Sequence, residues 1–232
     1  MQAERLLAVG AELAEGPVWD KQAQEVVWVD VLAGRVNRLS LNGQVGPSAQ
    51  LPSSVGAVAF ATNNAWFGAT PDGLRRLEDH FLAVGLPQQG SDLRMNDGKV
   101  DPQGRFVGGT MTIGRPRKGA GSLWSFDGAG VRMLVDNVTI SNGLAWSADG
   151  RTMFYVDTPT QRIDAFDYNP LSGAVANRRP WAHIPSEVGA PDGMCIDVEG
   201  GLWVALWGGS AVVRLLDGAV TERIEVPTSQ VT

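Results

Sequence analysis

Four side chains with oxygen donors recur at one position of a repeated pattern, where each precedes an apolar segment. They are Glu15, Asn96, Asn142 and Asp192. Two carboxylates and two amides without a cationic residue at that position are costly to gather unless a positive ion lies between them. Such hard oxygen donors suit Ca²⁺, Mg²⁺ or Mn²⁺, and carboxylates also accept Zn²⁺. The pattern predicts a site for one divalent cation, with open coordination positions for water and a substrate oxygen.

The pattern itself is a repeat of 40–50 residues with starts near 15, 56, 96, 142 and 192. Each repeat has an apolar run, a polar turn and a second apolar run, as in "EGPVWDKQAQEVVWVD", "GAVAFATNNAWFGAT", "NDGKVDPQGRFVGGT", "NGLAWSADGRTMFYVDT" and "DGMCIDVEGGLWVAL". A third apolar segment follows in every repeat, and a weaker fourth follows in some, such as "TERIEVP". Four short strands per repeat, without helical periodicity, predict an all-β propeller.

In a propeller the first strand of each blade lines the central channel, so residues at the same repeat position converge there. A β-sandwich is the alternative fold, but it has no reason to keep the repeat in phase. Asn or Asp beside glycine is also a common turn former, and this reading holds for any one of the four residues alone. Their shared position in the repeat favours the cation site.

Composition excludes several classes of partner. The formal net charge of −6 argues against binding to nucleic acid or to an anionic membrane. No run of 18 apolar residues occurs, and the first residues, "MQAERLLAVG", lack the features of a signal peptide. One cysteine cannot form an internal disulfide, which fits a reducing cytoplasm. The hydrophobic content of 44% is ample for one packed domain over residues 1–232.

Other catalytic chemistries have little support. The sequence has no Gly-x-Ser-x-Gly motif, and neither His80 nor His183 has a nucleophile motif nearby. Cys195 falls in a predicted inner strand, where we expect a packed, inert thiol.

Four segments resemble the signature segments of the gluconolactonase/regucalcin (senescence marker protein) family of six-bladed propellers. They are "LAEGPVWD", "RMNDGKVDPQGRFVGGTM", "SNGLAWSADGRTMFYVDT" and "APDGMCIDVEGGLWVALWGG", and the resemblance runs from residue 12 to the end of the chain. It implies the hydrolysis of a sugar lactone, in carbohydrate metabolism, with one divalent metal ion in the channel. We expect Ca²⁺ first, with Zn²⁺, Mn²⁺ or Mg²⁺ as alternatives.

The same resemblance implies roles for individual residues. Glu15, Asn142 and Asp192 would be the direct metal ligands, and Asp192 would also be the general base that removes a proton from water. Arg94 would hold sugar hydroxyls or the ring oxygen, and Asn96 would approach the metal or the substrate. An ordinary charge at the channel edge is the alternative for Arg94, and a purely ligating role is the alternative for Asp192.

The chain departs from the family pattern at two places. Some members carry an acid shortly after Gly-Thr-Met, whereas here Thr112, Ile113 and Gly114 follow, so a substrate preference is not transferred. The next blade is expected to begin near residue 232, where the sequence ends. We therefore expect about five blades, two unpaired sheet edges, and an N-terminal strand, "RLLAVG", of the kind that joins the last blade.

Two other functions share this ligand set. One is a non-catalytic, calcium-binding or regulatory propeller, and the other is a relative that cleaves organophosphates or aryl esters. Arg94 and the polar channel favour catalysis, because metal storage needs no group to hold a substrate. The sequence predicts a small lactone as partner and does not indicate an oligomeric state.

Overall fold

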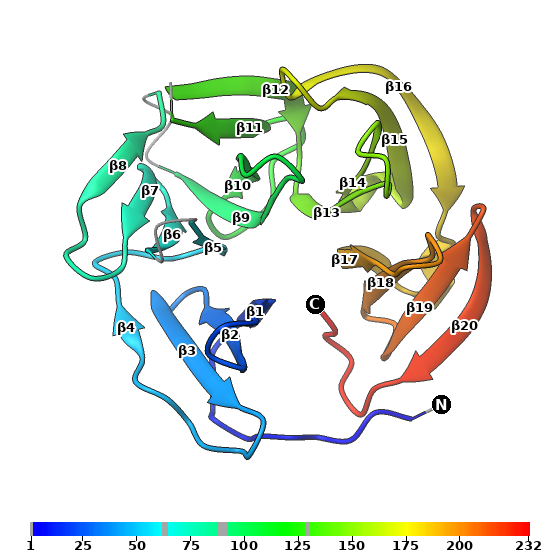
Figure 1. Cartoon of the computed structure of the whole chain (residues 1–232). Helices are drawn as coiled ribbons and strands as arrows, with labels where there is room; N and C mark the ends of the chain where they lie inside the picture. Colours follow the sequence, from blue (N-terminus) through cyan, green and yellow to red (C-terminus); the bar gives the residue numbers. More distant parts are fainter. Residues whose placement is uncertain (1, 62–64, 88–91, 129) are drawn as a thin grey trace.

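The computed structural model describes residues 2–61, 65–87, 92–128 and 130–232, and these form a ring of five four-stranded antiparallel sheets (Figure 1). The prediction of an all-β propeller with about five blades is confirmed. The helices among the described residues are two short 3₁₀ turns, η1 (Thr158–Thr160) and η2 (Ser186–Val188). Residues 62–64, within the second predicted repeat, lie outside the described residues. No helix in the described part of the chain is long and apolar enough to cross a membrane.

Within every sheet the strands neighbour one another in chain order. The first sheet contains β1 (Ala14–Asp20), β2 (Glu25–Asp30), β3 (Arg35–Ser40) and β4 (Ala49–Gln50). The second contains β5 (Val58–Phe60), β6 (Trp66–Thr70), β7 (Gly73–Arg76) and β8 (Leu82–Gly85). The third contains β9 (Leu93–Val100), β10 (Phe106–Thr112), β11 (Gly121–Asp127) and β12 (Gly130–Val138). The fourth contains β13 (Ser141–Trp146), β14 (Thr152–Asp157), β15 (Arg162–Asn169) and β16 (Ala174–His183). The fifth contains β17 (Ala190–Ile196), β18 (Leu202–Trp207), β19 (Ala211–Leu216) and β20 (Ala219–Glu225).

The apolar core lies between the faces of neighbouring sheets. Among the described residues it forms four clusters, one for each junction from the first sheet to the fifth. For example, Val29 and Trp66 join the first two sheets, and Tyr155 and Val107 join the third and fourth. Alternate residues of a strand face opposite sides of its sheet, so each central sheet contributes to two junctions. Burial at these junctions turns the sheets into a ring around one axis.

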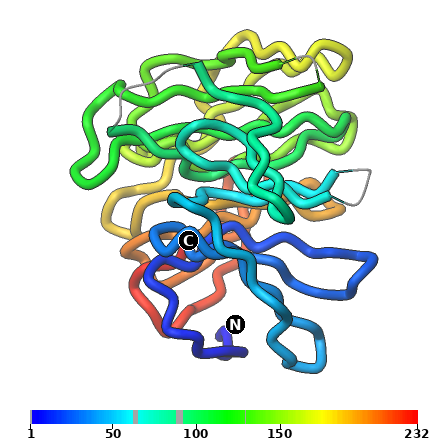
Figure 2. The backbone as a smooth tube through the Cα atoms, turned by 90° about the vertical axis from the view of Figure 1, so that its left-hand side faces the viewer, coloured from blue at the N-terminus to red at the C-terminus, as the bar shows by residue number. Residues whose placement is uncertain are grey.

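Both ends of the chain lie between the fifth sheet and the first. Gln2 pairs in parallel with Glu225 at the end of β20, and Figure 2 shows this blue segment beside the red strand from the side. The N–H of Ala3 donates to the carbonyl of Glu225 at 2.8 Å. At the other end, Thr232 Oγ1 donates to the Ala14 carbonyl at 3.1 Å. The predicted N-terminal strand at residues 5–10 is not paired as a strand; the pairing involves residue 2 instead.

The innermost strands share an irregularity at the repeat position singled out in the sequence. The pairing register of β1 shifts between Glu15 and Val18, and that of β13 shifts between Ser141 and Leu144. The register of β17 shifts between Pro191 and Met194. The pairing of β9 with β10 shifts in the same way, across residues 96 and 97. Such β-bulges bend a strand and re-aim its side chains, so the predicted site residues leave the regular alternation of their strands.

A buried aspartate supports the main chain that enters two of these strands. Asp30, the last residue of β2, accepts the N–H groups of Glu12 and Leu13 at 3.2 and 3.0 Å. Asp157, the last residue of β14, accepts those of Thr139 and Ile140 at 3.1 and 2.9 Å. Both carboxylates thus accept N–H groups of the residues just before β1 and β13, in place of the strand-to-strand hydrogen bonds that those N–H groups do not make.

Replacing Asp157 with alanine should strongly destabilise the fold. The change leaves two partly buried main-chain N–H groups without their acceptor, so we expect the free energy of unfolding to fall by about 1–3 kcal/mol. Urea unfolding followed by tryptophan fluorescence measures this loss. Asp136→Ala, at an exposed position of β12, is the matched control and should change stability by less than about 0.5 kcal/mol. Equal losses in the two variants would contradict the assigned role of Asp157.

Candidate metal site in the central channel

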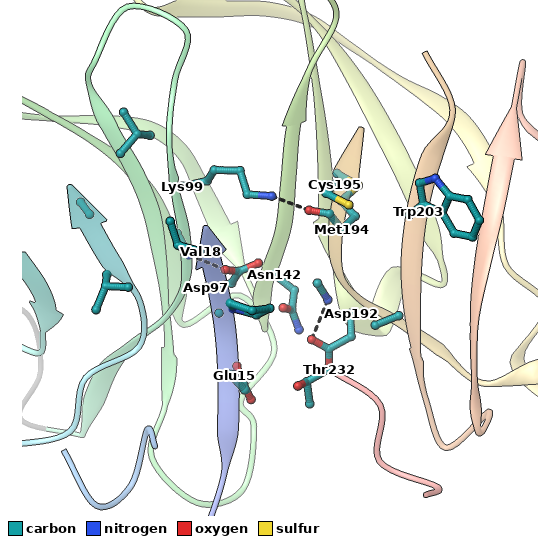
Figure 3. A pocket seen from close by; sticks show the side chains of 18 of the residues that line it. Glu15, Val18, Asp97, Lys99, Asn142, Asp192, Met194, Cys195, Trp203 and Thr232 are labelled. Atoms are coloured by element: carbon teal, nitrogen blue, oxygen red, sulfur yellow. Dashed lines mark hydrogen bonds between the residues drawn. The ribbon is translucent and has the colours of Figure 1, made fainter. Parts of the chain in front are cut away.

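The innermost strands surround a cavity of about 510 Å³ near the ring axis. Its lining includes three of the four predicted oxygen donors, namely Glu15 from β1, Asn142 from β13 and Asp192 from β17. Figure 3 shows these three side chains gathered around one space. The residues lie up to 177 positions apart in the sequence (192 − 15). The sheet-to-sheet packing therefore brings together a site that local structure alone could not build.

Two glycines allow the innermost strands to approach one another closely. Gly143 follows Asn142, and a Cβ at this residue would lie 2.6 Å from the carbonyl oxygen of Asp192. Gly56 occupies the shared repeat position in the second sheet, where a Cβ would lie 2.1 Å from the carbonyl oxygen of Asn96. Both separations are too short for a side chain. At this repeat position the second sheet therefore carries no oxygen-donor side chain, because the main chain of the third sheet lies against Gly56.

The fourth predicted donor, Asn96, does not line the cavity. Its side chain is buried between the third and fourth sheets, where Nδ2 donates to the Ser141 carbonyl and Oδ1 accepts from Arg94 Nη1, each at 2.8 Å. Arg94 is also buried and outside the cavity lining, and Nη1 donates again to its neighbour's carbonyl at Met95. These two residues form a fixed polar pair behind the cavity wall.

Asp97 is the residue that the repeat pattern missed. It follows Asn96 in β9 and lines the cavity together with Glu15 and Asp192 (Figure 3). Neighbouring residues of a regular strand point to opposite faces, so the choice of Asn96 left its neighbour out. The register shift spans residues 96 and 97, so the repeat position alone does not determine which of the two faces the cavity. The sequence does show an acid next to Asn96, in "NDG", but whether its side chain faces the cavity depends on the bulge.

Lys99 and Thr158 also escaped the sequence analysis. Lys99 lines the cavity, and its Nζ donates to the Met194 carbonyl at 2.6 Å. Thr158 Oγ1 accepts from Asn142 Nδ2 at 3.1 Å and donates to the Pro191 carbonyl at 2.9 Å. Thr158 thus connects the Asn142 side chain to the strand that carries Asp192.

Cys195 lies in β17 as predicted, but its thiol is exposed at the cavity wall and is not packed. The reason is strand alternation, because the preceding Met194 is the residue that faces the core between the fourth and fifth sheets.

The carboxylates of the cavity disfavour one another's charge. Burial, followed by the charges of Asp192 and Asp97, raises the pKa of Glu15 to about 8, and the Arg94 guanidinium opposes the shift. Burial and the charge of Asp97 raise the pKa of Asp192 to about 7, against the stabilising N–H of Gly193. Burial also raises the pKa of Asp97, and the charge of nearby Lys99 offsets part of this rise. Ionised carboxylates here need a further positive charge.

The residues present fit a divalent cation. Asn142 Oδ1 is buried and accepts no hydrogen bond from the described residues, while its Nδ2 is held by Thr158. An unpartnered amide oxygen between two raised-pKa carboxylates is an arrangement that a hard cation would satisfy. In the described part of the chain no three His, Cys, Asp or Glu side chains lie close enough to form a metal cluster. The candidate ligand set is therefore mixed, with one amide and two acids.

Replacing Glu15 with glutamine should change the pH dependence of stability in the metal-free protein. The pKa of Glu15 in the folded protein, about 8, exceeds its ordinary value of 4.5. The stability that this group contributes is thus complete below pH 4.5 and is lost as the pH rises through about 8. We expect Glu15→Gln to raise the melting temperature over the unsubstituted protein at about pH 9 and not at about pH 5, by roughly 2–4 °C per kcal/mol of repulsion removed. Differential scanning calorimetry with EDTA present checks this. A gain of equal size at both pH values, or the same profile in Glu4→Gln at the exposed N-terminal segment, would contradict it.

Comparison with known proteins agrees with this architecture. Residues 13–232 match the family model "SMP-30/Gluconolactonase/LRE-like region". The chain is 37% identical over 230 residues to "Putative sugar lactone lactonase YvrE" of Bacillus subtilis, covering 96% of this chain and 78% of that protein. It is 36% identical to regucalcin of Gallus gallus, covering 97% and 79%. A crystal structure described as a calcium-binding protein, regucalcin, from Agrobacterium tumefaciens superposes with a TM-score of 0.90 at 29% identity, covering 97% of this chain and 78% of that one. The chain therefore belongs to the SMP-30/gluconolactonase/LRE-like family.

Proposed function

We propose that this protein hydrolyses a sugar lactone with the help of one divalent cation held by Glu15, Asn142 and Asp192. The observation that carries the proposal is the unpartnered Asn142 oxygen in one cavity with two carboxylates whose pKa values are raised by burial and by neighbouring negative charges. The name of the Bacillus subtilis relative, a sugar lactone lactonase, supports the substrate class. The description of the Agrobacterium relative as calcium-binding supports Ca²⁺ as the cation.

When bound, the cation supplies positive charge that polarises the lactone carbonyl and stabilises the oxyanion that develops on it. Asp192 is the proposed general base. Its Oδ1 accepts the N–H of Gly193 at 2.7 Å, which orients the carboxylate in the cavity. Asp192 takes a proton from the attacking water as the water oxygen bonds to the carbonyl carbon. The ring C–O bond then breaks, and the leaving oxygen takes up the proton that Asp192 removed from water, which gives an open-chain hydroxy acid and regenerates the base.

Arg94 is the proposed substrate-binding group next to the cavity, and Asn96 serves it indirectly, because both residues lie outside the cavity lining and Asn96 holds the Arg94 guanidinium. Asn96 Oδ1 and the Met95 carbonyl both hold Arg94 Nη1, so the guanidinium is fixed in place, and its Nε and Nη2 make no hydrogen bond with the described residues. The Arg94 guanidinium opposes the rise in the pKa of Glu15, which supports a role for its charge beside that carboxylate. A guanidinium fixed in this way can present paired donors to sugar hydroxyls.

Removal of metal should abolish lactone hydrolysis. We expect EDTA-treated protein to release no acid above background from an aldonolactone in a pH-indicator assay, and added Ca²⁺ to restore turnover. Zn²⁺, Mn²⁺ and Mg²⁺ are compared in the same assay. Turnover that persists without metal would contradict the proposal. Tight Ca²⁺ binding without any turnover would instead support the non-catalytic, calcium-binding alternative, which the description of the Agrobacterium relative as calcium-binding favours.

Substitution of Asp192 should separate its two proposed roles. Asp192→Asn keeps an oxygen donor but cannot accept a proton, so we expect kcat to fall about 10²–10⁴-fold with a smaller loss of metal affinity. Asp192→Ala removes the donor as well and should lose both. Steady-state kinetics and calorimetric titration with Ca²⁺ provide the two readouts. Asp136→Asn, on the outer strand β12, is the control. A kcat in Asp192→Asn close to that of the control would mean that Asp192 is a ligand only.

A further inference from the structure

Lys99 joins two sheets that are not neighbours in the ring. It comes from β9 in the third sheet, and its Nζ donates to the carbonyl of Met194 in β17 of the fifth sheet at 2.6 Å. The fourth sheet lies between them (Figure 1), so this side chain spans the channel, as Figure 3 shows. Lys99 lines both the large cavity and a smaller one of about 290 Å³, so it lies at the boundary between them.

The acceptor of this hydrogen bond lies beside a weak point of β17. The ladder between β17 and β18 is interrupted between Pro191 and Met194, and Asp192 is one of the two residues in the interruption. Asp192 and Gly193 therefore have no paired residue across the sheet to fix their main chain. Within this interval the N–H of Gly193 donates back to Asp192 Oδ1, a bond that adds no link to β18, and the Asn142 side chain supports the Asp192 carboxylate from β13.

Two side chains hold the ends of the interruption instead. On one side, Thr158 Oγ1 donates to the Pro191 carbonyl at 2.9 Å. On the other side, Lys99 donates to the Met194 carbonyl. The Lys99 ammonium has the additional function of bringing a positive charge beside Asp97. An ammonium in a partly buried channel is costly unless it is paired, so its position is restrained by the carbonyl and the nearby acid together.

We propose that Lys99 is a positioning residue of the cation site, which holds the bulged main chain of β17 from across the channel and thereby sets the position of the Asp192 carboxylate. The inference rests on the proposed function, because it assigns Asp192 to the cation. Residues that orient ligands without touching the metal typically change metal affinity 10–100-fold when they are replaced. An effect of that size is expected here.

The sign of the effect separates positioning from charge. Removing an ammonium near three carboxylates would, by charge alone, leave cation binding stronger or unchanged. Releasing the β17 bulge would make it weaker, because Asp192 is then no longer held in place. Weaker binding in a variant without the ammonium is therefore specific to positioning.

The test uses Lys99→Met, which keeps the length of the apolar stem but lacks the donor and the charge. Calorimetric titration of metal-free protein with Ca²⁺ is expected to show about 10-fold or more weaker binding than in the unsubstituted protein. Lys99→Arg, which keeps a cationic donor, should bind more tightly than Lys99→Met. Lys21→Met, in the exposed turn between β1 and β2, is the matched control and should bind normally. Circular dichroism establishes that each variant is folded.

The outcomes are distinct. If Lys99→Met binds Ca²⁺ as tightly as the control or more tightly, the positioning role is overturned, even when its melting temperature has fallen. If Lys99→Met does not fold, Lys99→Arg is compared with Lys99→Gln, whose side chain is too short to reach the Met194 carbonyl. Equal Ca²⁺ affinity in these two variants would likewise overturn the positioning role. If the unsubstituted protein itself binds no divalent cation, the proposed function fails before the role of Lys99 is tested.

Discussion

The close approach of main chain around the ring axis is the constraint on which the rest of this structure depends. Apolar side chains at four sheet-to-sheet junctions press the innermost strands together. The approach is close enough that Gly56 and Gly143 have no room for a Cβ. Strands this close cannot all keep a regular ladder while also directing polar groups at the axis. The bulges at residues 15–18, 141–144 and 191–194 resolve that conflict.

The entrances and the bulges of the innermost strands carry main-chain groups that side chains satisfy. Asp30 and Asp157 accept N–H groups at the entrance of β1 and β13, while Thr158 and Lys99 donate to carbonyls on both sides of Asp192. Buried main-chain polar groups are almost always paired, so such contacts are required by the architecture. The side chains around the channel thus bind main-chain groups, and they affect the site by fixing the strands that carry its residues.

The same closeness makes the site electrostatically unfavourable without a cation. Burial raises the pKa values of Glu15 and Asp192, the charge of Asp97 raises both further, and the charge of Asp192 also raises that of Glu15. Arg94 and Lys99 each offset part of the negative charge from a different side. Three acids that line one cavity disfavour one another's charge, and the proposed cation would offset that repulsion. This physical argument and the family membership point in the same direction.

The sequence by itself determined the repeat. Its polar turns and paired apolar runs, 40–50 residues apart, specify short strands locally, and the propeller and the shared position of Glu15, Asn142 and Asp192 followed from that period. Tertiary structure alone decided which neighbour in "NDG" faces the cavity. Asn96 turns into the wall beside Arg94, and Asp97 lines the space, because a bulge shifts the alternation that sequence reasoning assumes. Lys99 likewise carries no local signal, since its partner, the Met194 carbonyl, lies 95 residues away. Local patterns record the period of a strand, whereas a bulge and a cross-channel contact depend on what packs against that strand from elsewhere in the chain.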